Sequence, residues 1–259
     1  MCRMMGLFGS FKEEEVIKII QEGRMLSKSG NVPLGSSPGH MDGYGVSVFR
    51  NDKWGDVDRG TGAASDSTTL IPNVKKATEK EFSALLFHMR KASPHIGKVY
   101  LENTHPFLRH NCQWAFQHNG SIFGWQGLPT GDYTSTSKES DSEAFFRFLL
   151  TRINSKGGST IAEIIKLAYE EAQTFIESAT SFTSILSSGE QSFVVRSFTK
   201  NEKYLTLFVR SEKNRAVVAS EPLRSFGPEN SWKLIPNKTL LHFSFEKGYQ
   251  EPVQYNLAF

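Results

Sequence analysis

The residue best placed to do chemistry is Cys2, because it directly follows the initiator methionine. Initiator methionine is removed when the next residue is small, and its removal would leave Cys2 with both a thiol and a free α-amino group. The thiolate is the nucleophilic form of cysteine. A free amine on the same residue can take the thiol proton and return it to a leaving group, as in N-terminal nucleophiles. The alternative is that Cys2 is a small apolar residue that begins a buried strand.

A second candidate functional residue is Arg90, which follows the apolar segment 84–89. That segment is predicted to be a buried strand, so it would deliver His88 and Arg90 to its end. A planar guanidinium there can bind a substrate carboxylate through two parallel hydrogen bonds. The alternative is a structural ion pair with a carboxylate at the edge of the core.

The tripeptide His118-Asn119-Gly120 also admits two interpretations. Asn-Gly between two strands is a strong hairpin signal, and this motif predicts a turn between strands at 114–117 and 121–125. The catalytic alternative is that the Asn119 amide and the Gly120 N–H point at a developing oxyanion. One such donor contributes about 10²–10³ in rate.

Asp141 lies within Ser140-Asp141-Ser142-Glu143, a sequence that matches the capping box at the start of a helix. A carboxylate at this position complements the helix dipole. A carboxylate fixed at a helix start is equally suited to bind a substrate ammonium group, so both interpretations stay open.

Other polar residues near these motifs are predicted to orient their neighbours. They are His40, Asp42, His88, Asn103, His105 and His118. No two Cys or His residues have the spacing of a zinc site, and no glycine-rich phosphate loop precedes a helix. We therefore expect neither a metal nor a cofactor.

Composition narrows the class of protein. The 259 residues are 38% hydrophobic with a net charge of +3, which predicts a globular chain and gives no reason to expect nucleic-acid or membrane binding. No apolar run approaches the roughly 18 residues of a transmembrane helix. Two cysteines and no export signal predict a reducing, cytoplasmic setting, with Cys112 packed as a small buried residue.

The hydrophobic pattern predicts helices and strands in alternating groups. Capping-box matches begin helices after Ser10, Ser140 and Thr160. The expected strands are 4–8, 44–50, 54–59, 84–89, 114–117, 121–125, 183–186, 192–199, 204–209, 216–219 and 239–245, with a loop over 93–111. Strands 44–50 and 54–59 are expected to form a hairpin around Asn51-Asp52. Strands in this number require two sheets packed together with helices outside, in a layered α/β or α+β fold. With no linker visible, we expect one domain over 1–259.

Taken together, the motifs resemble a known family. Cys2, Arg90, Asn103-x-His105-Pro106, His118-Asn119-Gly120 and Ser140-Asp141-Ser142-Glu143 occur in this order in class II glutamine amidotransferases, which are N-terminal-nucleophile hydrolases. The resemblance covers essentially the whole chain. Segments 87–93, 101–107 and 218–223 resemble the stand-alone branch, which lacks a fused synthase domain. The implied fold is α+β, a four-layer αββα sandwich.

The resemblance also implies a role for each matching residue. Cys2 would attack the side-chain amide of glutamine, giving glutamate and ammonia through a γ-glutamyl thioester. Asn119 and the Gly120 N–H would form the oxyanion hole. Arg90 would bind the substrate α-carboxylate and Asp141 its α-ammonium. Ser93 falls where relatives often carry a threonine that helps to hold the ligand.

Two departures from the family leave the substrate open. Many relatives continue after the arginine with Trp or His and then Ala-Thr, where this chain has Lys91-Ala92-Ser93, and the loop at His40-Met41-Asp42-Gly43 differs from that of synthase-fused relatives. The alternatives are a γ-glutamyl hydrolase acting on a peptide or modified thiol, another N-terminal-nucleophile amidase, and a non-catalytic partner-binding module. After Leu149 no acceptor-binding signature is visible. Ammonia would therefore go to water or to a protein partner, and a peptidase partner is a further expectation.

Overall fold

The computed structural model describes residues 2–92, 99–109, 111, 113–134, 138–155, 159–245 and 248–259. Ser93 and Cys112, both assigned roles from the sequence, lie outside these ranges. Within them, no helix combines the length and apolarity that a membrane crossing demands.

One seven-stranded antiparallel sheet contains the N-terminal strand at its centre, in the order β13-β11-β12-β1-β4-β2-β3. Its strands are β1 (Arg3–Gly9), β2 (Tyr44–Arg50), β3 (Lys53–Gly60), β4 (Ala84–Met89), β11 (Phe208–Glu212), β12 (Arg215–Ala219) and β13 (Lys233–Leu234). Because β1 is paired on both sides, with β12 and with β4, the start of the chain is held firmly in the sheet.

A second sheet has six antiparallel strands in the order β15-β14-β10-β9-β6-β5. They are β5 (Phe107–Arg109), β6 (Trp114–Asn119), β9 (Thr183–Ser187), β10 (Gln191–Arg196), β14 (Thr239–Ser244) and β15 (Val253–Asn256). A separate two-stranded ribbon joins β7 (Ile122–Phe123) to β8 (Ser178–Ala179).

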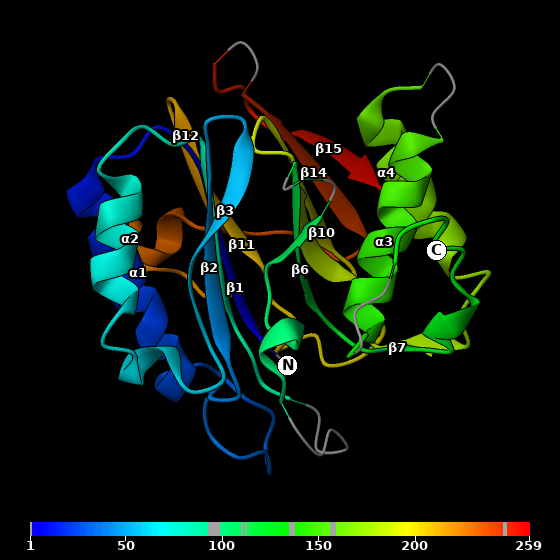
Figure 1. Ribbon diagram of the computed structural model, residues 1–259, viewed down its shortest axis with the longest axis horizontal. Coiled ribbons are helices and arrows are strands. Elements are labelled where there is room, and N and C mark those ends of the chain that lie inside the picture. The colour runs from blue at the N-terminus through cyan, green and yellow to red at the C-terminus, as the bar shows by residue number, and fades with distance from the viewer. Residues whose placement is uncertain are drawn as a thin grey trace.

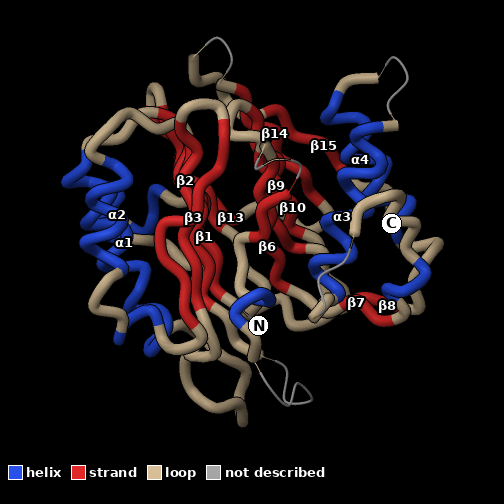
Figure 2. The backbone as a smooth tube through the Cα atoms, in the orientation of Figure 1, coloured by secondary structure: helices blue, strands red, loops and turns tan. Residues whose placement is uncertain are grey.

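The helices cover the outer faces of the two sheets. Helices α1 (Glu13–Ser29) and α2 (Leu70–Thr78) lie against the seven-stranded sheet, and α3 (Asp141–Asn154) and α4 (Ile161–Ala172) lie against the six-stranded sheet (Figure 1). Figure 2 shows the two sheets facing each other between the helices. The predicted α+β, four-layer αββα sandwich is confirmed.

Each interface between layers has its own apolar core, and β1 contributes to two of them. Met5 and Leu7 pack in the core beneath α1, while Met4 and Phe8 pack in the core between the sheets. A third core joins the six-stranded sheet to α3 and α4. Burying a side chain of this size contributes about 1.5–3 kcal/mol. The alternation along β1 therefore fixes its register and, with it, the position of Cys2.

Two of the three predicted helix starts are correct. Ser140 is the N-cap of α3, and Thr160 and Glu163 form a complete capping box on α4. The prediction for Ser10 is wrong, because α1 begins at Glu13 and the Lys12 N–H donates to the Glu15 carboxylate at 3.0 Å. Three consecutive glutamates fill the first turn there, where negative charge is favourable, and so displace the helix start.

The two predicted Asn-containing turns have opposite outcomes. Asn51 and Asp52 both have positive φ and join β2 to β3, as predicted. The predicted pairing of strands 114–117 and 121–125 around 118–120 is wrong, because β6 pairs with β5 and β9 while β7 pairs with β8. The Ile122 N–H donates instead to the Asp141 carboxylate at 2.8 Å, so the chain leaves β6 without returning along it.

The remaining differences between the predicted and observed elements are in segments whose hydrophobic pattern is weak. The expected loop 93–111 contains β5 and a short 3₁₀ turn, Leu101–Asn103, and helix α2 was not anticipated. The expected strand 204–209 begins only at Phe208, because the carbonyls of Tyr204 and Leu205 accept hydrogen bonds from the buried side chains of Arg3 on β1 and Arg196 on β10.

Candidate active site

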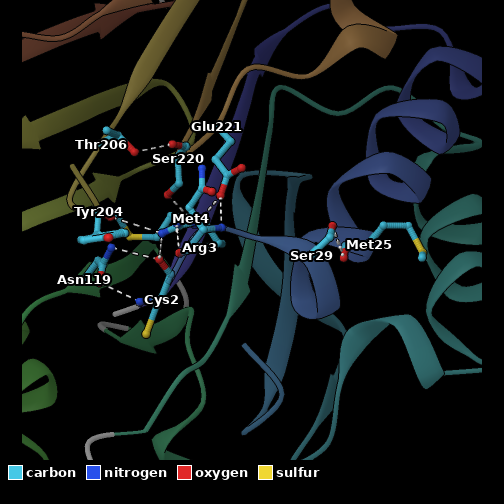
Figure 3. Close-up of polar contacts among 11 residues, drawn as sticks. Cys2, Arg3, Met4, Met25, Ser29, Asn119, Tyr204, Thr206, Ser220 and Glu221 are labelled. Carbon is cyan, nitrogen blue, oxygen red and sulfur yellow. Dashed lines mark hydrogen bonds and ion pairs between the residues drawn. The ribbon is translucent and has the colours of Figure 1, made fainter. Parts of the chain in front are cut away.

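Cys2 directly precedes β1 in the centre of the seven-stranded sheet and lies against the end of β6 from the other sheet. Its backbone N donates to Asn119 Oδ1 at 2.8 Å, and Asn119 Nδ2 donates back to the Cys2 carbonyl at 3.0 Å (Figure 3). The half-buried thiol lies against the backbone of Lys91, with Sγ 3.5 Å from the Lys91 N and 3.8 Å from its carbonyl oxygen. The backbone of Cys2 is therefore fixed from one sheet and its sulfur from the other.

The chain segment that touches the thiol follows β4 and is held by Asp42. The Arg90 N–H donates to the Gly43 carbonyl at 2.7 Å, and the Asp42 N–H donates to the Arg90 carbonyl at 3.0 Å. The Asp42 carboxylate then accepts from the Ala92 N–H at 2.8 Å. These three bonds enclose Lys91, so Asp42 determines where the backbone beside Sγ lies.

The Arg90 side chain is buried, and its guanidinium donates to the Asn103 carbonyl. None of the ion pairs found in the described parts of the chain includes Arg90. A structural ion pair with a core-edge carboxylate, the alternative from the sequence, therefore has no support among those residues. A guanidinium held on one side by a carbonyl keeps its remaining donors for an anion.

Across the site, His118 is fixed by two hydrogen bonds. Its Nε2 lies 2.9 Å from the Ser181 carbonyl and its Nδ1 lies 2.9 Å from the Ser142 hydroxyl. Because a carbonyl only accepts, Nε2 carries the proton and Nδ1 accepts from the hydroxyl. The pKa of His118 is lowered by burial, with the Asp141 carboxylate acting in the opposite direction.

Gly120 is required by the closeness of a neighbouring strand. A Cβ built at this position would lie 2.1 Å from the Ser181 carbonyl oxygen, so a side chain would push the two segments apart. Glycine therefore permits the tight exit from β6 directly after Asn119. The sequence suggested a turn glycine here, but the structural need is a close backbone approach.

Asp141 is half-buried at the first turn of α3, with both carboxylate oxygens engaged. Oδ1 accepts from the Ser142 N–H and Oδ2 accepts from the Ile122 N–H, each at 2.8 Å. The charge is thereby fixed beside the segment that leaves Asn119. Both sequence interpretations remain compatible with this placement, since carboxylate lone pairs are still available to an ammonium group.

Two further buried histidines, His88 and His105, lie close to the site, and His88 links the end of β4 to the end of β6. His88 Nε2 lies 3.3 Å from the His118 carbonyl, and the His88 and His105 ring centroids are 4.4 Å apart. Burial lowers the pKa of His88 to about 3, with the Arg90 charge as the next cause. Burial, followed by the charges of His88 and Arg90, holds the pKa of His105 well below its ordinary value. Both rings are therefore neutral near pH 7.

Only some of the residues singled out in the sequence lie near Cys2 in the structure. Asn119 and the backbone after Arg90 surround it, and Asp42, Asn103 and His88 support those segments. His40, in the loop that follows α1, instead packs against the last turn of that helix, where its backbone N–H donates to the Ser27 carbonyl at 2.6 Å.

Several contacts around the site were not anticipated from the sequence. They involve Arg3, Lys91, Ser142, Ser181 and Glu221. A charged residue at the start of an otherwise apolar strand was the available signal for Arg3.

With this geometry described, comparison with known proteins establishes the family. A family model described as "Glutamine amidotransferases class-II" matches residues 1–212. Since this is well over half of the 259 residues, the chain belongs to the class II glutamine amidotransferases. The resemblance predicted from the ordered motifs is confirmed.

Similar proteins from two bacteria share part of their length with this chain. YafJ of Escherichia coli K12 is 29% identical over 138 residues, covering 51% of this chain and 50% of YafJ. A Haemophilus influenzae relative is 30% identical over 156 residues, covering 58% of this chain and 50% of its own. The chain thus spans about half the length of the curated relatives it matches.

Solved structures share the fold at low sequence identity. The glutamine phosphoribosylpyrophosphate amidotransferase from B. subtilis matches all of this chain and 50% of its own length, with a TM-score of 0.63 and 17% identity. A glutamine aminotransferase class-II domain protein from Silicibacter pomeroyi matches over 100% of both chains, with a TM-score of 0.58 and 16% identity.

Proposed function

We propose that this protein hydrolyses the γ-amide of glutamine, with Cys2 as an N-terminal nucleophile. The observation that carries the proposal is the reciprocal pair between Cys2 and Asn119, combined with the Lys91 backbone against Sγ. The family membership supports glutamine as the substrate. The arrangement holds both groups of Cys2 that N-terminal nucleophile chemistry uses.

The reaction begins once Met1 has been removed. The Cys2 amine takes the thiol proton, and Sγ attacks the amide carbon of glutamine to form a tetrahedral oxyanion. Collapse of this intermediate forms the γ-glutamyl thioester and breaks the C–N bond, and the amine returns its proton to the departing ammonia. Water then attacks the thioester, with the amine as base, and releases glutamate and the Cys2 thiol.

Asn119 serves two functions in this scheme. Its Oδ1 accepts a hydrogen bond from the Cys2 N, which orients the amine beside the thiol. Its Nδ2 carries two hydrogens, and the bond to the Cys2 carbonyl uses one of them. The second hydrogen, together with the Gly120 N–H, is proposed to stabilise the oxyanion.

Substrate recognition is assigned to a fixed cation and a fixed anion. Arg90 binds the α-carboxylate of glutamine and Asp141 binds its α-ammonium, which distinguishes an amino acid from a simple amide. Support comes from the Arg90 guanidinium, whose observed partner is a neutral carbonyl, and from the anchored Asp141 carboxylate. Ser93 is proposed to contact the same ligand. The ammonia is released to water or to an acceptor protein.

The proposal is tested by removing the thiol. Purified protein is assayed for glutamate release from glutamine, and intact mass is measured before and after exposure to a thiol-alkylating glutamine analogue. We expect the native protein to lack Met1, to release glutamate and to gain one label at Cys2. Cys2→Ala should lose both activity and labelling. Sustained turnover by Cys2→Ala, or a native protein that releases no glutamate, would refute the proposal.

A further inference from the structure

Arg3 is unusual because its charged side chain is completely buried beside the nucleophile. It is the first residue of β1, and its side chain is 0% exposed. Arginine is almost never fully buried unless its charge and donors are satisfied. The side chain turns back toward Cys2 instead of continuing the apolar pattern of the strand (Figure 3).

The guanidinium of Arg3 gathers three distant segments around Cys2. Nη1 donates to the Cys2 carbonyl at 3.0 Å and to the Tyr204 carbonyl at 3.3 Å, and Nη2 donates to the Asn31 carbonyl. Nε donates to Glu221 at 2.5 Å. The same Glu221 oxygen accepts from the Asn31 N–H at 2.8 Å, so the carboxylate fixes both Arg3 and the segment that Arg3 binds.

Through these bonds, Arg3 restricts the orientation of the nucleophile. The Cys2 carbonyl accepts from both Arg3 Nη1 and Asn119 Nδ2, and two donors occupy the two lone pairs of a carbonyl oxygen. A carbonyl held from two directions cannot rotate about the Cα–C bond without breaking one of these contacts. Because the Cys2 N is also bound to Asn119 Oδ1, rotation about this bond is blocked at both ends, and the amine and thiol are fixed relative to the proposed oxyanion donors.

A second buried arginine provides an internal comparison. Arg196 is 2% exposed and donates to the Leu205 carbonyl at 2.9 Å and to the Ile235 carbonyl at 2.7 Å. It binds the segment next to Tyr204, as Arg3 does, but its bonds do not include Cys2. The two side chains therefore share burial and backbone bracing, and only Arg3 reaches the nucleophile.

We propose that Arg3 is a positioning residue for the Cys2 nucleophile and that Glu221 holds Arg3 in place. This inference rests on the proposed function, because it concerns how Cys2 is presented to the substrate. Arg3 acts through the Cys2 carbonyl and does not touch the substrate. Loosening it should slow the chemical steps while leaving glutamine binding unchanged.

The test compares Arg3→Lys with Arg196→Lys, which removes the same guanidinium fork from a site away from Cys2. Only protein with native circular dichroism is assayed, for kcat and KM with glutamine and for inactivation by the thiol-alkylating analogue. Arg3→Lys should lower kcat and the maximal inactivation rate at least tenfold with KM unchanged. Arg196→Lys should keep kcat within about twofold. Equal losses in both variants, or native kcat in Arg3→Lys, would overturn the proposal.

Glu221→Gln provides the second variant, because glutamine keeps the shape and an acceptor oxygen but removes the charge that holds Arg3. A fall in kcat at constant KM, smaller than in Arg3→Lys, supports the inference. Native kcat in Glu221→Gln contradicts it and decides the matter if Arg3→Lys does not fold. Since native protein with Cys2-dependent turnover is required first, failure of the proposed function would be recognised before these variants are compared.

Discussion

The ends of β4 and β6 lie on opposite sides of Cys2 and are held in different ways. After β4, the chain is fixed by backbone bonds and by the half-buried Asp42 carboxylate. The end of β6 itself is fixed by a buried side chain, because His118 of this strand is bound to Ser142 and Ser181. The comparison indicates that the β6 end is the more rigid, because its supports are shielded from water and satisfied internally.

This difference suggests a division of tasks under the proposed function. Rigid, preorganised donors are most useful where charge develops in the transition state, and Asn119 is at the rigid end. A cation that recognises the ground-state carboxylate can tolerate more freedom, and Arg90 is at the other end. Changes at the β6 end should therefore act on kcat, and changes at the β4 end on KM.

The largest effect is expected from Asn119→Asp. Aspartate keeps an acceptor for the Cys2 N but removes the Nδ2 donor and adds negative charge beside the oxyanion. We expect kcat to fall by about 10²–10³ or more, with KM changed little. Steady-state kinetics with glutamine measure both values. A variant that altered KM alone would place Asn119 in substrate binding and reverse the comparison.

The next effect is expected from Arg90→Lys, which keeps the charge but loses bidentate geometry. A hydrogen bond to a charged group contributes about 1.5–3 kcal/mol, so KM should rise about tenfold or more with kcat largely kept. Arg59→Lys is the matched control, because Arg59 contacts the carbonyl of Pro106 in the adjacent loop at 2.8 Å. Similar KM values for the two variants would argue against substrate binding by Arg90.

The buried link between the two ends should make stability depend on pH. The pKa of His88 is about 3 in the folded protein and near 6.5 when unfolded, so the unfolded state binds more protons between these values. Stability is then fully present above pH 6.5 and is lost as pH falls, by up to about 1.4 kcal/mol per pH unit for this residue.

Urea unfolding of the native protein and of His88→Gln from pH 7 to pH 5 measures this contribution. The window lies above the ordinary titration of carboxylates, so their protonation contributes little. Glutamine can still donate to the His118 carbonyl. The native protein should lose stability more steeply than His88→Gln, and parallel curves would show that His88 takes up its proton equally in the folded and unfolded states, so that its pKa is not lowered by folding.

The smallest effect is expected from Asp42→Ala, which removes the acceptor for the Ala92 N–H. Loss of one such bond costs about 1 kcal/mol, so a change of about fivefold is expected, chiefly in KM. Ser47→Ala is a suitable control, since it removes a bond to Asp56 on a neighbouring part of the sheet. An Asp42→Ala loss confined to kcat would show that the β4 end serves the chemical step directly.

The sequence predicted strands well where apolar patterns were local and continuous. Segment 84–89 is β4 as expected, and β1 extends the predicted 4–8 by one residue at each end. The pattern also indicated two sheets with helices outside, while the αββα sandwich came from the family resemblance. The exit from β6 was mispredicted, because its course depends on Asp141 and Ser181, which no local window includes.

Site residues could be predicted from the sequence where the side chain itself indicated the chemistry. They could not be predicted where backbone atoms make the contact. Cys2 and Asn119 do meet, as their chemistry suggested. Lys91 contributes through its peptide group, which leaves no trace in the residue type. The Arg3 and Glu221 pair joins positions 218 residues apart, and only the fold brings them together.

The separation of these partners along the chain has a consequence for folding. Cys2 meets Asn119 across 117 residues, and Met4 meets Ser220 across 216. Closing such long loops costs entropy that is recovered only when both sheets are assembled, so these contacts form late. A chain that has acquired its helices but not its central strand would remain without a reactive centre. Recovery of catalysis during refolding should therefore lag behind recovery of helical structure.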